Sequence, residues 1–109
     1  MIRFGQVLGV RPERLAEYRR HHAAIWPDIA AAIRAAGIRN YSIFQHGGQL
    51  FAYYEYVGPP AEYAARMAAL AAAPRMREWW DVMEPMQVPR ADRAPGTWWT
   101  DMEEVFHLD

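Results

Sequence analysis

The 109-residue sequence predicts a single α+β domain in which helices cover one face of an antiparallel sheet. Three observations support this prediction. Runs rich in β-forming residues stand at the beginning, middle and end of the chain, helical patterns separate them, and two adjacent glycines join the middle pair of runs. The domain is expected to span residues 1–109, a length that can bury one hydrophobic core without disulfides or a structural metal.

The first strand and the first helical region follow each other directly. Residues 2–10 (IRFGQVLGV) alternate apolar side chains, and Pro12 then suits the first turn of a helix. Apolar or aromatic residues recur at spacings of three and four from residue 12 to residue 36, and Gly37 ends this pattern. Pro27 interrupts the region, because it lacks an amide hydrogen and crowds the preceding turn. We therefore expect a break or kink there, with the interrupted region forming a wall of any pocket.

The middle of the chain predicts a β-hairpin. Residues 38–46 (IRNYSIFQH) and 49–57 (QLFAYYEYV) are both rich in β-branched and aromatic residues. They flank Gly47 and Gly48, and a short glycine turn between two such runs is the strongest hairpin signal in this sequence. The two strands are therefore expected to be antiparallel neighbours.

The second half of the chain predicts two consecutive helices, a loop and a last strand. Residues 61–73 are rich in alanine, and residues 75–86 carry large apolar residues at helical spacing. Prolines, a glycine and charges in residues 87–101 indicate a surface loop, and residues 102–109 alternate as a strand would. The order strand, helix, two strands, helix, strand predicts a ferredoxin-like sheet with helices on one face. Because such a small domain would expose many aromatic residues, a homodimer is also expected.

Composition excludes several classes of chemistry. The chain contains no cysteine, and all 12 of its positive charges are arginines, so neither a thiolate nucleophile nor a lysine Schiff base can form. The net charge of -1, without a basic run, argues against a nucleic-acid partner. No signal peptide or membrane-length apolar stretch is present, which predicts a cytoplasmic protein that does not associate with membranes.

Two residues of the first helical region are candidates for catalysis. Tyr18 and His22 are four positions apart, so on a helix they project from nearly the same side. Leu15 and Ile29 mark that side as the one facing the sheet. The adjacent His21 points about 100° away and is interpreted as a solvated residue on the flank of the helix.

Structural and functional interpretations of these residues both stay open at this point. A lone histidine on an apolar face, such as His22, is more often a core residue satisfied by one hydrogen bond, and Trp79–Trp80 alone more often belongs to a core. The same imidazole, with an unperturbed pKa of roughly 6.5, could instead exchange protons with a hydroxyl or ether oxygen in a pocket. Tyr41 could reach that pocket, and the tryptophans could stack on the C–H face of a sugar.

A metal site is not expected. His22, His46 and His107 would have to converge with carboxylates, and no H-x-x-x-H or H-E-x-x-H spacing is present. Several acidic residues could provide paired carboxylates, but because some of them lie near helix ends or in a loop, all are interpreted as solvated surface groups. They are Glu78, Asp81, Glu84, Asp101, Glu103 and Glu104.

The motifs EYRRHHAAIWPDI, NYSIF, REWWDVM and EEVFHL, in this order, closely resemble the L-rhamnose mutarotase family over nearly the whole chain. The chain departs from the common family pattern at Asp28, where the family often has glutamate, and in the long segment 87–101. The resemblance implies a dimeric ferredoxin-like enzyme without a cofactor that interconverts sugar anomers. It also implies that the histidine of the Tyr-x-x-x-His motif is the proton donor and that the aromatic residues bind sugar. These are His22 for catalysis, and Tyr18, Tyr41, Trp79 and Trp80 for substrate binding.

The expected substrate is L-rhamnose or another deoxysugar such as L-fucose, which the motifs do not distinguish. We expect His22 to protonate the ring oxygen and later to recover the proton, whereas the base for the anomeric hydroxyl is not identified by the sequence. Two other classes share the order of elements. One is a cofactor-free or haem-linked monooxygenase of the dimeric α/β-barrel kind, and the other is a non-catalytic module that binds a small ligand or closes a dimer.

Overall fold

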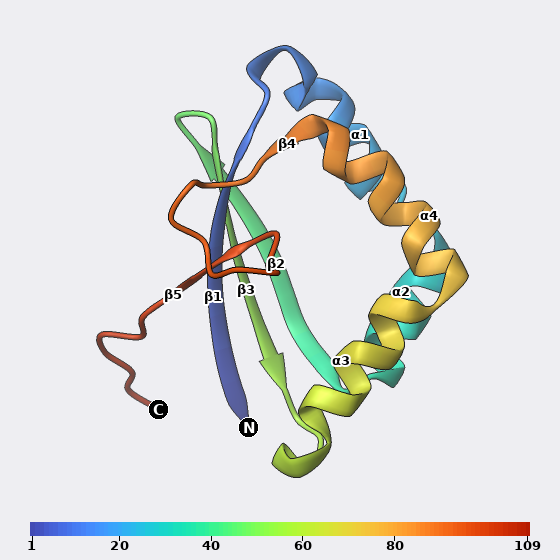
Figure 1. Ribbon diagram of the computed structural model, residues 1–109, viewed down its shortest axis with the longest axis vertical. Coiled ribbons are helices and arrows are strands. Elements are labelled where there is room, and N and C mark those ends of the chain that lie inside the picture. The colour runs from blue at the N-terminus through green and yellow to red at the C-terminus, as the bar shows by residue number, and fades with distance from the viewer.

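The computed structural model describes residues 1–109 as one antiparallel sheet with four α-helices on one of its faces (Figure 1). The α+β, ferredoxin-like prediction is confirmed. The strands are β1 (Ile2–Val10), β2 (Ile38–His46), β3 (Gln49–Tyr56), β4 (Gln87–Val88) and β5 (Thr100–Met102). The helices are α1 (Leu15–Ala23), α2 (Pro27–Ala35), α3 (Tyr63–Ala72) and α4 (Pro74–Met83). Single 3-10 turns lie at Pro12–Arg14, Pro60–Glu62 and Glu84–Met86.

Strand β1 lies inside the sheet and pairs on both of its edges. One edge pairs with β3 from Ile2 to Gly9, and β3 in turn pairs with β2 across the Gly47–Gly48 turn, as the hairpin prediction requires. The other edge of β1 pairs with β4 at Gly9 and Val10 and with β5 at residues 5–7. The fourth position in the sheet is therefore shared by two short strands, and residues 89–99 leave the sheet between them.

The prediction of a last strand over residues 102–109 is wrong, and so is the prediction that residues 87–101 form only a loop. Both β4 and most of β5 lie in the expected loop, whereas residues 103–109 have no regular structure. Met102 pairs with Gly5, so an antiparallel continuation of β5 would find only three more residues of β1 to pair with. The sequence has the alternating pattern of a strand, but the edge of β1 is too short to pair with all of residues 103–109.

Helices α1 and α2 are two separate helices, which confirms the expected break. Helix α1 ends at Ala23, the backbone of Trp26 is extended, and Pro27 occupies the first turn of α2. The Asp28 carboxylate then accepts a hydrogen bond of 2.7 Å from Nε of Arg75 in α4. The start of α2 thus contacts α4 at the surface, and Ile29 of α2 packs in the same core as Met76, Trp79 and Met83 of α4.

The hydrophobic core lies between the sheet and the helices. Every helix except α3 contributes a fully buried residue to it, and β1 and β3 supply the sheet side. Burial of these side chains is the main favourable term that holds the two layers together. The core residues are Leu8, Val10, Tyr18, Ile29, Leu50, Met76, Trp79, Met83 and Met86.

Replacement of Gly37 by alanine is expected to destabilise the fold. Gly37 ends α2 with φ +94°, and an added Cβ would lie 3.1 Å from Cε1 of the fully buried Tyr56. A left-handed backbone alone costs a residue with a Cβ about 1–2 kcal/mol. Gly96→Ala is the matched control, because Gly96 has φ +79° and an added Cβ there would meet no atom within 4 Å. Urea unfolding should show a larger decrease in the free energy of unfolding for Gly37→Ala than for Gly96→Ala. Equal decreases would contradict crowding of residue 37 by Tyr56.

Candidate active site

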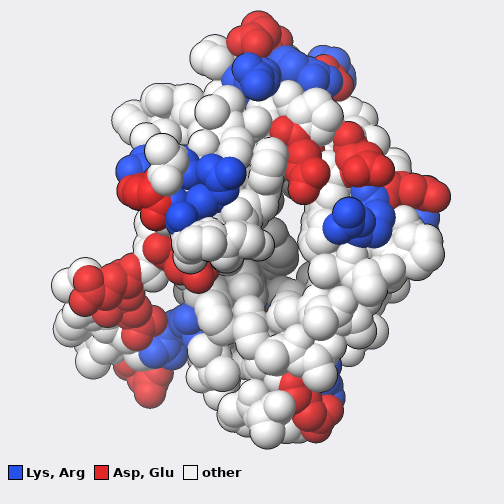
Figure 2. Space-filling model, viewed as in Figure 1, with Lys and Arg blue, Asp and Glu red and all other residues white.

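A cleft of about 1080 Å³ lies between the sheet and the helices. Figure 2 shows its opening as a hollow surrounded mainly by uncharged residues, with charged side chains at the periphery. All five residues singled out from the sequence line this cleft, although they come from α1, β2 and α4. They are Tyr18, His22, Tyr41, Trp79 and Trp80.

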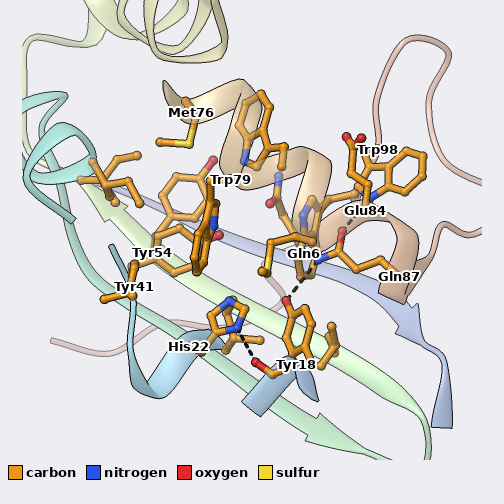
Figure 3. A pocket seen from close by; sticks show the side chains of 18 of the residues that line it. Gln6, Tyr18, His22, Tyr41, Tyr54, Met76, Trp79, Glu84, Gln87 and Trp98 are labelled. Carbon is orange, nitrogen blue, oxygen red and sulfur yellow. Dashed lines mark hydrogen bonds between the residues drawn. The ribbon is translucent and has the colours of Figure 1, made fainter. Parts of the chain in front are cut away.

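His22 is held in one tautomer by the backbone of its own helix. Its Nδ1 lies 2.9 Å from the carbonyl oxygen of Tyr18, and because a carbonyl can only accept, Nδ1 carries the hydrogen. The opposite edge of the ring, with Nε2, faces into the cleft (Figure 3). Burial lowers the pKa of His22 below that of a free histidine, and this effect outweighs the bond to the carbonyl, which raises it. The imidazole is therefore neutral at pH 7, and Nε2 is a hydrogen-bond acceptor.

Aromatic rings pack against His22 on two sides. The ring centroid of Tyr18 lies 4.3 Å away, and the ring of Trp79 meets the imidazole edge-on at 5.6 Å. His21 does not line the cleft: its Nε2 lies 3.6 Å from a carboxylate oxygen of Glu17, and the ring of Trp79 meets its ring edge-on at 6.5 Å. Helical periodicity therefore separates the two adjacent histidines as the sequence indicated.

Tyr18 is almost completely buried and takes part in a chain of hydrogen bonds. Its hydroxyl accepts a hydrogen bond of 3.1 Å from Nε2 of Gln87, and Oε1 of Gln87 accepts one of 2.8 Å from the indole N–H of Trp98. Burial is the main reason that the pKa of Tyr18 is raised, so the phenol keeps its proton at any pH of interest. Sequence reasoning missed Gln87 and Trp98 because both lie in the expected surface loop. The two adjacent tryptophans at residues 98–99 of a polar segment were the available signal.

Tyr41 brings a second phenol to the cleft from β2. The residue as a whole is 42% exposed, yet desolvation of the phenol raises the pKa of Tyr41 to about 12, so the hydroxyl end is the enclosed part. Its ring centroid lies 5.5 Å from that of Tyr54 in β3. The hydroxyl of Tyr54 is itself 2.8 Å from the hydroxyl of Tyr63. Tyr54 also lines the cleft and was not singled out from the sequence.

The two adjacent tryptophans of α4 differ in how deeply they are buried. Trp79 is 5% exposed and belongs to the core as well as to the cleft, whereas Trp80 is half-buried. The interrupted region does form a wall of the cleft, with Ile25 beside the break and Ala30 and Ile33 from α2. Trp26 does not line it; its ring packs edge-on against Trp79 at 5.1 Å and lies under the guanidinium of Arg75. The region around the break thus lines the cleft, and Trp26 supports that wall from behind through Trp79.

Two carboxylates that were interpreted as surface groups also reach the cleft. Asp101 in β5 accepts a hydrogen bond of 2.9 Å from Nε2 of Gln6, and Glu84 follows α4 (Figure 3).

The structure contains no group of three or more His, Cys, Asp or Glu side chains that could hold a metal ion. None of its helices has the length and apolar character needed to cross a membrane.

Comparison with known proteins identifies the family. A family model for L-rhamnose mutarotase matches residues 3–108. The chain is 40% identical to the L-rhamnose mutarotase of Lactiplantibacillus plantarum over 111 residues, which cover 100% of both chains. The chain belongs to the L-rhamnose mutarotase family. The corresponding proteins of Opitutus terrae and Bacillus subtilis are 40% and 33% identical, again over 100% of both chains.

Solved structures show the same fold. The L-rhamnose mutarotase of Formosa agariphila matches with a TM-score of 0.77 at 23% identity, over 100% of both chains. The tetracenomycin F2 cyclase of Streptomyces glaucescens matches with a TM-score of 0.76 at 15% identity, over 100% of this chain and 98% of the cyclase. Because proteins named for two different activities share this fold, the fold does not decide the chemistry. Membership of the mutarotase family rests on sequence.

The environment of His22 predicts a specific pH dependence. Its pKa is lowered in the folded state, so between its folded and unfolded pKa values the unfolded chain binds more protons. The free energy of unfolding should therefore decrease as the pH falls below about 6.5, the ordinary value for histidine. His22→Gln should remove this contribution. An NMR titration of the His22 ring should give a midpoint below that of a free histidine, and a midpoint above it would contradict the assigned environment.

Proposed function

We propose that this chain interconverts the α and β anomers of L-rhamnose, or of a related deoxysugar such as L-fucose, without a cofactor. Its family membership supports the reaction class. The observation that carries the proposal is the pairing of a neutral imidazole acceptor on His22 with the hydroxyl of Tyr18 in one mainly apolar cleft. Anomer exchange needs a proton removed from one oxygen of C1 and supplied to the other, and such groups can do this near neutral pH.

His22 is the proposed proton carrier. Its Nε2 takes the proton of the anomeric hydroxyl as O1 forms the aldehyde C=O bond and the C1–O5 bond breaks. The imidazolium then gives that proton to O5, so the open-chain aldehyde and the enzyme are both neutral. Rotation about C1–C2 and the reverse steps close the ring on the other face of C1. His22 thus protonates the ring oxygen, and the lowered pKa supports it also as the base that the sequence left unidentified.

The aromatic residues are proposed to bind the sugar. Tyr18 and Tyr41 keep their protons because burial raises the pKa of each phenol, so both can donate hydrogen bonds to sugar oxygens. Trp79 and Trp80 offer flat apolar surfaces for the C–H face of the ring and for the methyl group of a deoxysugar. The mainly apolar lining strengthens each of these polar contacts by excluding water.

Neither the monooxygenase nor the non-catalytic alternative is supported by a specific contact in the cleft.

The reaction is testable by saturation-transfer NMR, which measures α/β exchange of L-rhamnose and L-fucose directly. The wild-type chain should accelerate exchange of at least one of these sugars. His22→Gln should reduce the acceleration about 100-fold or more, because it removes the group that transfers the proton. Arg20→Ala is the matched control, since Arg20 is exposed on the same helix and lies outside the cleft, and it should retain exchange. Circular dichroism checks folding; full activity in folded His22→Gln would contradict the assignment.

We also propose that the chain forms a homodimer, as the family resemblance implies. The terminal residues Val105, Phe106 and Leu108 are 89%, 78% and 79% exposed, so their apolar side chains contact almost nothing within one chain. A second copy would remove this surface from water.

Sedimentation equilibrium should therefore give twice the 12.6 kDa mass of one chain. Phe106→Ser should weaken association, whereas Glu103→Ser, at an exposed polar residue of the same tail, should not. A monomer at all concentrations would contradict the proposal.

A further inference from the structure

The hydrogen bonds that join Trp98, Gln87 and Tyr18 run in one direction (Figure 3). An indole N–H can only donate, so it must face the carbonyl oxygen of the Gln87 amide rather than its NH₂ group. The NH₂ group of the same amide then faces the hydroxyl of Tyr18 and donates to it. The donor on Trp98 therefore fixes the orientation of the Gln87 amide, although its oxygen and NH₂ ends have nearly the same shape.

The direction of this chain decides what the hydroxyl of Tyr18 can do. Because its oxygen accepts from Gln87, its own hydrogen is not used in that contact, and no other side chain or backbone group of the protein bonds to the hydroxyl. The residue lines the cleft, so the hydrogen is available to a bound ligand. A reversed amide would instead present Oε1 to Tyr18 and take that hydrogen. Trp98 thus acts on Tyr18 without touching it.

We propose that Trp98 and Gln87 are positioning residues that hold Tyr18 as a hydrogen-bond donor to the ring oxygen of the sugar. This inference rests on the proposed function. The ring oxygen O5 is an ether and can only accept, which matches a group committed to donating, and the anomeric hydroxyl can donate to Nε2 of His22. The bond from Tyr18 stabilises charge that develops on O5 as C1–O5 lengthens, and His22 supplies the proton, so Tyr18 stays neutral throughout.

The segment that supplies Trp98 is held in place by its own hydrogen bonds. Residues 89–99 leave the sheet between β4 and β5, and within them Arg93 donates to the carbonyl oxygens of Arg90 at 2.7 Å and Thr97 at 2.9 Å. The hydroxyl of Thr97 donates to another carbonyl of the same segment at 2.7 Å. Trp98 follows Thr97 directly and packs against the core, so these bonds shape the loop and the packing of Trp98 holds it beside the amide.

A double-mutant cycle on the exchange rate tests the coupling. Tyr18→Phe and Trp98→Phe each keep an aromatic ring but remove one donor, and each should lower kcat about ten-fold, the effect of one hydrogen bond of about 1.4 kcal/mol. The double variant should be no slower than Tyr18→Phe, because Trp98 acts only through that hydroxyl. Trp99→Phe is the control, because Trp99 also lines the cleft but its indole makes no hydrogen bond; its effect on kcat should be the same whether residue 18 is Tyr or Phe. If the losses of kcat in Tyr18→Phe and Trp98→Phe instead multiply in the double variant, the proposal is overturned.

Two substitutions of Gln87 distinguish positioning from shape. Gln87→Glu retains the shape, but its new carboxylate only accepts and takes the hydrogen of Tyr18, so kcat should fall further than in Gln87→Met, which leaves that hydrogen free. A purely structural role predicts the opposite order, and that order would overturn the proposal. Thermal unfolding of both variants checks that each is folded.

An NMR measurement without sugar separates this inference from the proposed function. In the wild-type chain the indole hydrogen of Trp98 should exchange slowly with water, and Gln87→Met should shift its resonance and speed its exchange. An unchanged indole signal would overturn the inference whatever the activity. A wild-type chain that accelerates exchange of no deoxysugar would instead overturn the proposed function and the donation to O5, while a responsive indole signal would show that the chain of hydrogen bonds exists.

Discussion

The hydrogen bond between His22 and the backbone carbonyl of Tyr18 is the contact on which the chemistry of the cleft depends. It joins residues four apart on α1, so it needs no long-range contact and forms as soon as the helix forms. It leaves Nε2 without a hydrogen and turns it toward the cleft, while burial keeps the ring neutral. The same spacing places the ring of Tyr18 against the imidazole. One local interaction thus sets the tautomer and the direction of the catalytic candidate, and burial sets its charge.

The remaining parts of the site come from distant segments that the sheet brings together. Tyr41 arrives from β2, the tryptophan pair from α4, and Gln87 from the short β4. Helix α4 is held by its core residues Met76, Trp79 and Met83, and the exposed ion pair between Arg75 and Asp28 also joins it to the start of α2. The break between α1 and α2 therefore has a function in assembly, because it lets the chain turn so that α2 reaches α4.

The shared position of β4 and β5 lets a segment between two strands line the cleft. Both strands pair with the same edge of β1, so the chain can leave the sheet between them without loss of the core. The segment that leaves, residues 89–99, contributes Trp98 to the cleft. A tetracenomycin F2 cyclase shares the fold at 15% identity, which agrees with chemistry being set by side chains in the cleft rather than by the layers around it.

The sequence by itself determined the local features of this protein. Strand β1, the hairpin at Gly47–Gly48, the break before Pro27 and the common face of Tyr18 and His22 all follow from residue type and spacing over a few positions. The tertiary structure alone decided where the fourth strand lies and which residues complete the site. The alternating pattern of residues 102–109 predicted a strand, but the edge of β1 available to it ends three residues beyond Gly5. Gln87 and Trp98 lie in a segment that resembles a surface loop; Gln87 reaches Tyr18 because β4 is paired with β1, and Trp98 bonds to Gln87. Strand pairing and burial depend on contacts between distant segments, and no local pattern encodes them.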